Sequence, residues 1–219
     1  AYFGKLFRQA QQAAGPASAK LGAHRGDVSR PQWGRDTLDR VVDLNVSGGF
    51  GEYLAWLEDW RERYKQVVWT YGGAPSSTSS ALGILAQGLD LYGRGVDGFV
   101  PWLTLGGEKN WTAFEDTCVF YTGKPMGVQG ACASLRLKAY RRAEQDIEYV
   151  WLYAEKHGLL KGDPSRLRAG KLLGGAIQAT KKLGKLDAEG AVTESYSDLK
   201  PEDFEHLRLA LAKGVAGKP

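Results

Sequence analysis

Several residues of the kinds that bind sugars lie near the ends of short predicted strands. Trp69 and Tyr71 end the run QVVWTY, and Trp102 lies near the end of VDGFVPWL. Asp27 and Asn45 lie near the ends of two earlier strand-like runs. Aromatic rings stack on the apolar faces of sugars, while carboxylates and amides bind hydroxyl groups. Because ligands bind at the carboxyl ends of strands in α/β folds, these five are the candidate substrate-binding residues, although Trp69 and Trp102 could instead fill the core.

A second group of candidate residues lies in the stretch SLRLKAYRRAEQDIEYVWLYAEKHG, which holds the carboxylates Asp146 and Glu148. Apolar residues recur here every three or four positions, which predicts an amphipathic helix. Two residues of a helix that are two positions apart point about 200° from each other. The two carboxylates therefore cannot converge on one glycosidic bond, and a structural role is expected. Arg142 is predicted to pair with Asp146, with Arg136 or nearby backbone as further partners.

Strands and helices alternate along the first 158 residues. Strands are predicted over 20–28, 40–47, 66–71 and 96–103, and helices over 2–14, 50–65 and 79–92. Alternation of this kind predicts a parallel sheet with right-handed crossovers. A complete TIM barrel needs eight such units. The expected fold class is therefore α/β, with about four parallel strands alternating with helices as in the C-terminal half of a TIM barrel, or a small open α/β sheet.

The remaining residues, 159–219, predict a helical C-terminal extension to a half-barrel domain formed by residues 1–158. A helix is expected from Pro164, with Asp163 as its N-cap. A loop follows over residues 186–197. The final helix is expected over residues 201–215, with Pro201 in its first turn.

Composition excludes several classes of protein. The chain has 219 residues, 43% hydrophobic and 25% charged, with a formal net charge of +4, which is typical of a globular protein. It shows no zinc-finger, RNA-recognition or basic-zipper signature, so no nucleic-acid partner is expected. No run of about 18 apolar residues is present, so no membrane partner is expected. No signal peptide is visible, and because the chain starts without Met its compartment cannot be read from the N-terminus.

Cofactor and nucleophile chemistry also lack support in the sequence. Three scattered histidines show no metal-ligand spacing, so no metal or cofactor is expected. The phosphate-binding pattern GxxxxGK[ST] and the nucleophile pattern GxSxG are absent. Cys118 and Cys132 could form one disulfide, but two cysteines define no framework.

The order of several motifs resembles a known family. RGDVSRPQW, LDRVVDLNVSG, VVWTYGGAP, VDGFVPWL, YTG and SLRLKAYRRAEQDIEYVWLY follow one another as in the C-terminal half of the catalytic barrel of glycoside hydrolase family 123 and its uncharacterised relatives. The resemblance covers roughly residues 1–155 and is most specific in the last motif, which is similar to SxRLExLRDGxEDYEYL. The chain departs from the family at Thr122, where Pro is usual, at Lys138, where an acid is usual, and at Ala143-Glu144, where Asp-Gly is usual.

This resemblance implies a TIM-barrel hydrolase that acts on N-acetyl-β-galactosaminides. In the family, the 2-acetamido group of the substrate attacks the anomeric carbon, and an adjacent Asp-Glu pair orients that group and supplies the general acid/base. The chain contains no Asp-Glu dipeptide in that order, and the family's pair is expected before Ala1. The chain therefore resembles the substrate-binding half of a hydrolase, expected to be inactive alone, with a glycan or small sugar as ligand. Secretion or a periplasmic location is what the family implies.

Two other functions stay open on the sequence. The chain could be a non-catalytic carbohydrate-binding or structural α/β module, or an unrelated small α/β protein that binds surfaces through its basic residues. A half barrel also leaves two open sheet edges, which proteins usually cover. Association is therefore expected with an N-terminal barrel half or with a second copy, unless the helical tail covers an edge.

Overall fold

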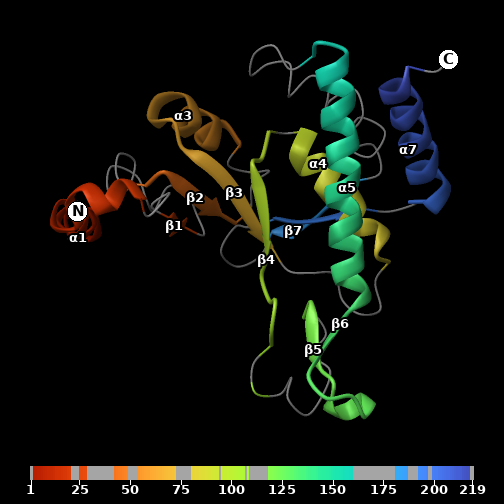
Figure 1. Cartoon of the computed structure of the whole chain (residues 1–219), viewed down its shortest axis with the longest axis horizontal. Coiled ribbons are helices and arrows are strands. Elements are labelled where there is room, and N and C mark those ends of the chain that lie inside the picture. Colours follow the sequence, from red (N-terminus) through yellow and green to blue (C-terminus); the bar gives the residue numbers. More distant parts are fainter. Residues whose placement is uncertain are drawn as a thin grey trace. The chain divides into compact units, whose positions relative to one another are not determined.

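The computed structural model describes residues 2–20, 25–28, 42–48, 54–72, 80–93, 95–106, 108, 118–159, 181–186, 192–196 and 199–217 (Figure 1). The chain divides into two compact units. The first comprises Ala1–Gly72, Val96–Val100 and Asp187–Val192, and the second comprises Gly73–Gly95, Pro101–Leu186 and Thr193–Pro219. The boundary that the sequence predicted after residue 158 stays a prediction; in the structure the last helix packs in the same unit as the helices before that residue.

The first unit is built around a sheet whose strands lie in the order β1-β2-β3-β4. β1, β2 and β3 pair in parallel, with Leu44 opposite both Arg25 and Val67. This confirms an α/β fold with parallel strands, while closure into half of a barrel stays a prediction. The elements of this unit are α1 (Tyr2–Ala14), η1 (Gly15–Lys20), β1 (Arg25–Val28), β2 (Leu44–Ser47), α3 (Leu54–Tyr64), β3 (Val67–Gly72) and β4 (Gly98–Pro101).

Asp97 joins the start of β4 to β3 and α3. Its main-chain N–H donates to the carbonyl of Val68 at 2.9 Å, and its Oδ2 accepts from the N–H of Val68 at 2.9 Å. The same oxygen accepts from Nη2 of Arg61 on α3 at 3.2 Å. A partly buried carboxylate is costly unless it is paired in this way. Asp97 is therefore a structural acid at the amino end of β4.

Trp69 on β3 lies against Gly98 on the neighbouring strand β4. A Cβ atom at Gly98 would come within 2.6 Å of Cε2 and Nε1 of the Trp69 indole. Real Cβ contacts are essentially never so short, so the indole occupies the space that any other residue would fill. The glycine thus fixes where the Trp69 ring lies on the sheet.

The second unit is built around three helices, α4 (Leu82–Gly93), α5 (Leu135–Lys156) and α7 (Pro201–Ala216), with α5 in contact with both others (Figure 1). α4 and α5 approach closely, since a Cβ atom at Gly88 would lie 3.0 Å from Cβ of Ala143. Among the helices that are described, none is both long and apolar enough to cross a membrane. The shared core of α4, α5 and α7 consists of the buried residues Ile84, Leu85, Ala86, Leu89, Tyr92, Ala139, Val150, Phe204 and Leu211.

A hairpin precedes α5. β5 (Phe120–Thr122) and β6 (Ala131–Ala133) pair antiparallel, and η3 (Lys124–Met126) lies in the turn between them. Ser134 then caps α5, because its hydroxyl accepts a hydrogen bond from the N–H of Leu137 at 3.3 Å. The helix predicted for the stretch SLRLKAYRRAEQDIEYVWLYAEKHG is confirmed as α5.

The C-terminal region is only partly the helical extension that the sequence predicted. α7 begins at Pro201 as expected, but β7 (Lys181–Leu186) and β8 (Val192–Tyr196) form a two-stranded sheet before it. β8 falls within the stretch predicted to be a loop. Its residues VTESY include β-branched and aromatic side chains, which favour strands. The helix predicted from Pro164 lies outside the described residues.

We expect Gly98→Ala to destabilise the fold by about 1 to 3 kcal/mol, because the added methyl group collides with the Trp69 indole. Urea unfolding followed by tryptophan fluorescence would measure this. Gly83→Ala is the matched control, since a Cβ there meets nothing within 4 Å and it should leave stability equal or higher. Equal stability of Gly98→Ala and the parent chain would contradict this packing.

Candidate functional site

The aromatic side chains of β3 lie on one face of the sheet. Side chains alternate along a strand, and Val68 and Thr70 are buried while Trp69 and Tyr71 are only partly buried. Trp69 and Tyr71 therefore share the face opposite to Val68 and Thr70, and Tyr71 lies close to the carboxyl end of β3. This is the end at which α/β folds bind ligands. The structure thus brings together two of the five predicted site residues.

Asn45 lies on the other face. It pairs in register with Val68, and residues opposite each other in a parallel sheet point to the same side. Its side chain is 4% exposed, and its Nδ2 donates to Oε1 of Gln66 at 3.5 Å. Its Oδ1 has no hydrogen-bond partner among the described residues. Asn45 is also the second residue of β2, so it lies nearer the amino end than the sequence suggested, and the structure does not group it with Trp69.

Asp27 and Trp102 are placed less completely. Asp27 is the third residue of β1 and pairs in register with Val46, which in turn pairs with Trp69. The side chain of Asp27 lies outside what the structure describes. Trp102 follows directly after β4 and belongs to the second unit, where its side chain is 62% exposed. It is therefore a surface residue and does not fill a core.

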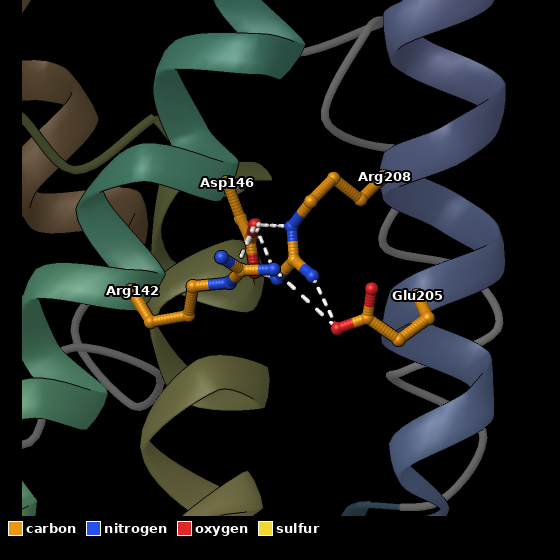
Figure 2. Close-up of polar contacts among 4 residues, drawn as sticks. All are labelled: Arg142, Asp146, Glu205 and Arg208. Carbon is orange, nitrogen blue, oxygen red and sulfur yellow. Dashed lines mark hydrogen bonds and ion pairs between the residues drawn. The ribbon is translucent and has the colours of Figure 1, made fainter.

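The Asp146 carboxylate is buried between α5 and α7, as Figure 2 shows. It accepts from Nε of Arg208 at 2.8 Å and from Nη2 at 3.0 Å, which is a two-point contact with one guanidinium. The predicted pair with Arg142 is present at 3.9 Å. Glu205 accepts from Nη1 of Arg208 at 2.5 Å. Asp146 therefore joins the two helices, in agreement with the structural role predicted for it.

Burial raises the pKa of Asp146 to about 6; the Arg142 guanidinium lowers it and the Glu205 carboxylate raises it. The carboxyl is therefore mostly ionised at neutral pH and bound to Arg208. Because its folded pKa lies above the ordinary 3.8, the folded chain binds this proton more tightly than the unfolded chain does. The stability contributed by this group is present below about pH 4 and is lost as the pH rises through about 6.

Arg136 holds the hairpin against the start of α5. The sequence offered it as a partner for Asp146, but its Nε and Nη2 donate to the carbonyl of Cys118 at 3.0 and 2.8 Å. Nη2 also donates to the Tyr121 hydroxyl, and the guanidinium carbon lies 5.6 Å from the centre of that ring. Two residues that carry the family resemblance, Tyr121 and Arg136, thus form a buried structural contact.

Among the described residues, no group of three or more His, Cys, Asp or Glu side chains is placed to hold a metal ion. Cys118 and Cys132 are both free thiols, so the disulfide that the sequence left open is not formed. Cys132 lies opposite Tyr121 in the hairpin, and Cys118 precedes the hairpin.

Sequence reasoning missed two residues that shape this region. Arg208 lies 62 positions from Asp146, so no local pattern identifies it as the partner. Gly98 sets the position of Trp69, and its only signal was a glycine inside a predicted strand, which often marks a close approach of neighbouring groups.

Comparison with known proteins gives one partial match. No family model and no curated protein matches the sequence. A solved structure of a family 123 glycoside hydrolase from Clostridium perfringens, reported for glycolipid glycan hydrolysis, aligns with 16% identity and a TM-score of 0.44. The alignment covers 83% of this chain and 32% of that enzyme, so the chain spans about a third of its length.

We expect Asp146→Asn to change the pH dependence of stability. Between pH 4 and pH 7 the parent chain should lose roughly 1 to 3 kcal/mol relative to the variant, because only the parent carries the raised pKa. Urea unfolding at several pH values would measure this difference. Glu148→Gln, an exposed carboxylate on the same helix, is the control and should follow the parent curve. The raised pKa would be contradicted if the parent chain kept or gained stability relative to Asp146→Asn as the pH rises from 4 to 7.

Proposed function

We propose that this chain is a carbohydrate-binding, glycoside-hydrolase-like protein that supplies the substrate-binding half of a barrel. The observation that carries the proposal is the pair of partly buried aromatic side chains, Trp69 and Tyr71, on one face of β3, with Tyr71 next to the last residue of the strand. Rings in this position offer a flat apolar surface, and the hydroxyl of Tyr71 and the N–H of Trp69 add polar atoms at its edge. A sugar ring presents a matching combination of apolar faces and hydroxyl groups.

The proposed ligand class is an N-acetylgalactosamine-containing glycan, which is what the resemblance of the motifs to glycoside hydrolase family 123 implies. Trp102 is proposed as a further stacking residue, because its ring is exposed directly after a strand end. Asn45 is left out of the proposed contacts because its side chain is buried on the other face of the sheet. Asp27 stays a proposed contact, since it pairs in register with Val46 on β2, and Val46 pairs in register with Trp69 on β3.

The proposed role is binding rather than cleavage by this chain alone. Substrate-assisted hydrolysis of the kind implied by the motifs uses an adjacent Asp-Glu pair, and this sequence holds no such dipeptide. Two carboxylates that the structure describes, Asp146 and Asp97, already have partners. Asp146 is occupied by Arg208, and Asp97, partly buried, is occupied by Arg61 and the main chain of Val68.

Replacing the aromatic residues should weaken sugar binding. We expect Trp69→Ala and Trp102→Ala each to raise the dissociation constant for methyl N-acetyl-β-galactosaminide about fivefold, a loss of about 1 kcal/mol of stacking. Isothermal titration calorimetry would measure it. Trp151→Ala, an exposed tryptophan on α5, is the matched control and should bind like the parent chain. Unchanged affinity in the first two variants, or an equal loss in the control, would return both rings to a structural role.

Hydrolysis by the chain should be absent. A chromogenic N-acetyl-β-galactosaminide incubated with the purified chain should release no chromophore above the rate in buffer. The reason is the missing Asp-Glu pair, without which neither the acetamido group nor the leaving group is assisted. Sustained turnover that is retained on repurification would contradict the proposed binding role. Failure to bind any sugar would instead favour the structural α/β module.

A further inference from the structure

Exposed apolar side chains gather in two neighbouring segments of the second unit. Large apolar side chains are normally covered, and an exposed group of them marks a contact surface. We call this group the apolar end. It consists of Trp102, Leu105, Met126, Val128 and Leu135, with exposed fractions of 62, 63, 46, 51 and 76%.

Main-chain hydrogen bonds hold the two segments next to each other. The N–H groups of Val119 and Phe120 donate to the carbonyls of Leu103 and Thr104 at 3.2 and 3.0 Å. The segment that carries Trp102 and Leu105 therefore lies beside the start of β5. Figure 1 shows the β5–β6 hairpin and its turn extending away from α4 and α7.

The turn of the hairpin presents its apolar side chains from a fixed backbone. Gly123 N–H donates to the Gly130 carbonyl at 2.7 Å, and the N–H groups of Met126 and Val128 donate to the Gly123 carbonyl at 2.9 and 3.0 Å. A Cβ atom at Gly123 would lie 2.4 Å from the Val128 carbonyl oxygen, so this position requires glycine. Met126 and Val128 are thus exposed on a tightly bonded turn.

The exposed charges described in and beside these segments are three cations and one carboxylate, that of Glu108. From Thr117 to Ala143 the sequence contains no Asp or Glu, and residues 101–107 carry no charge. The exposed cations of this region are Lys124, in the turn, and Lys138 and Arg141, in the first two turns of α5. The described part of these segments therefore exposes apolar side chains together with more positive than negative charge.

We propose that the apolar end docks onto the interface of an anionic lipid bilayer, with Met126 and Val128 of the turn entering the acyl region. Anionic headgroups match the surrounding cations, and the hydrocarbon below them accepts the aliphatic side chains. Tryptophan is favoured at this depth of a membrane, which suits Trp102. The inference shares only Trp102 with the proposed sugar contacts and rests on Met126 and Val128 of the turn. It departs from the expectation of no membrane partner because it concerns surface contact rather than a span.

The charge pattern favours an anionic bilayer over two other candidate partners of the apolar end, a second copy of the chain and a nucleic acid. A second copy docked symmetrically through the apolar end would place cations against cations, which opposes association. A nucleic acid would match the cations, but it offers no apolar phase for Leu105, Met126 and Val128. An anionic bilayer matches both the cations and the apolar side chains of this surface.

Co-sedimentation with vesicles tests the proposal. The full chain should bind vesicles of phosphatidylcholine mixed with phosphatidylserine about tenfold or more tightly than vesicles of phosphatidylcholine alone, and added salt should weaken this binding. The double variant Met126→Asp and Val128→Asp should lose binding. Leu209→Asp, a change at an exposed leucine of α7, should bind like the parent chain. Circular dichroism would check that each variant is folded.

A charge-reversal variant tests the cations separately from the apolar side chains. Lys124→Glu combined with Lys138→Glu leaves the apolar side chains in place and should reduce binding to the anionic vesicles about tenfold. Equal binding of the parent chain to both vesicle types would overturn the proposal. Light scattering that shows a dimer of the parent chain, which Met126→Asp and Val128→Asp converts to a monomer, would also overturn it and assign the surface to a second copy.

Discussion

The alternation of side chains along β3 is the constraint on which the candidate site depends. Because successive residues of a strand point to opposite faces, burying Val68 and Thr70 leaves Trp69 and Tyr71 on the other face. Gly98 on β4 then provides the space in which the Trp69 indole lies. A shift of the strand by one residue would exchange the two faces and bury the aromatic pair instead. The available aromatic surface is thus a consequence of strand register.

The buried charged residues of the long helix α5 have a structural role, and not the catalytic role that carboxylates in a conspicuous motif first suggest. Buried charges require partners, and both of its buried charged residues have them. Arg136 binds the main chain and the tyrosine of the hairpin, and Asp146 binds Arg208 of α7. The charged positions of the most specific motif therefore hold the second unit together.

The strongly periodic helices could be predicted from the sequence, because their local pattern and their packing agree. α1 has the predicted bounds of residues 2–14, α5 follows Ser134, and α7 begins at Pro201. The parallel order of the first strands also follows from their alternation with helices. For these elements local propensity and tertiary structure point to the same answer.

The face and the partners of individual side chains could not be predicted in the same way. The run RVVDLNVS contains no signal for where pairing begins, so only the register opposite β3 reveals that Asn45 is buried. Arg136 and Arg142 are nearer to Asp146 in sequence than Arg208, yet Arg208 makes the close contact, because α7 packs beside α5. The strand β8 was missed because its flanking polar residues resemble those of a loop.

The central proposal is that the rings of Trp69 in the first unit and Trp102 in the second unit contact a sugar ligand. Nuclear magnetic resonance of the tryptophan side-chain N–H groups during titration with N-acetylgalactosamine tests it most directly. The signals of Trp69 and Trp102 should shift and saturate, while those of buried Trp60 and of exposed Trp151 on α5 stay unchanged. Unchanged signals for Trp69 and Trp102, or shifts confined to Trp151, would contradict the account.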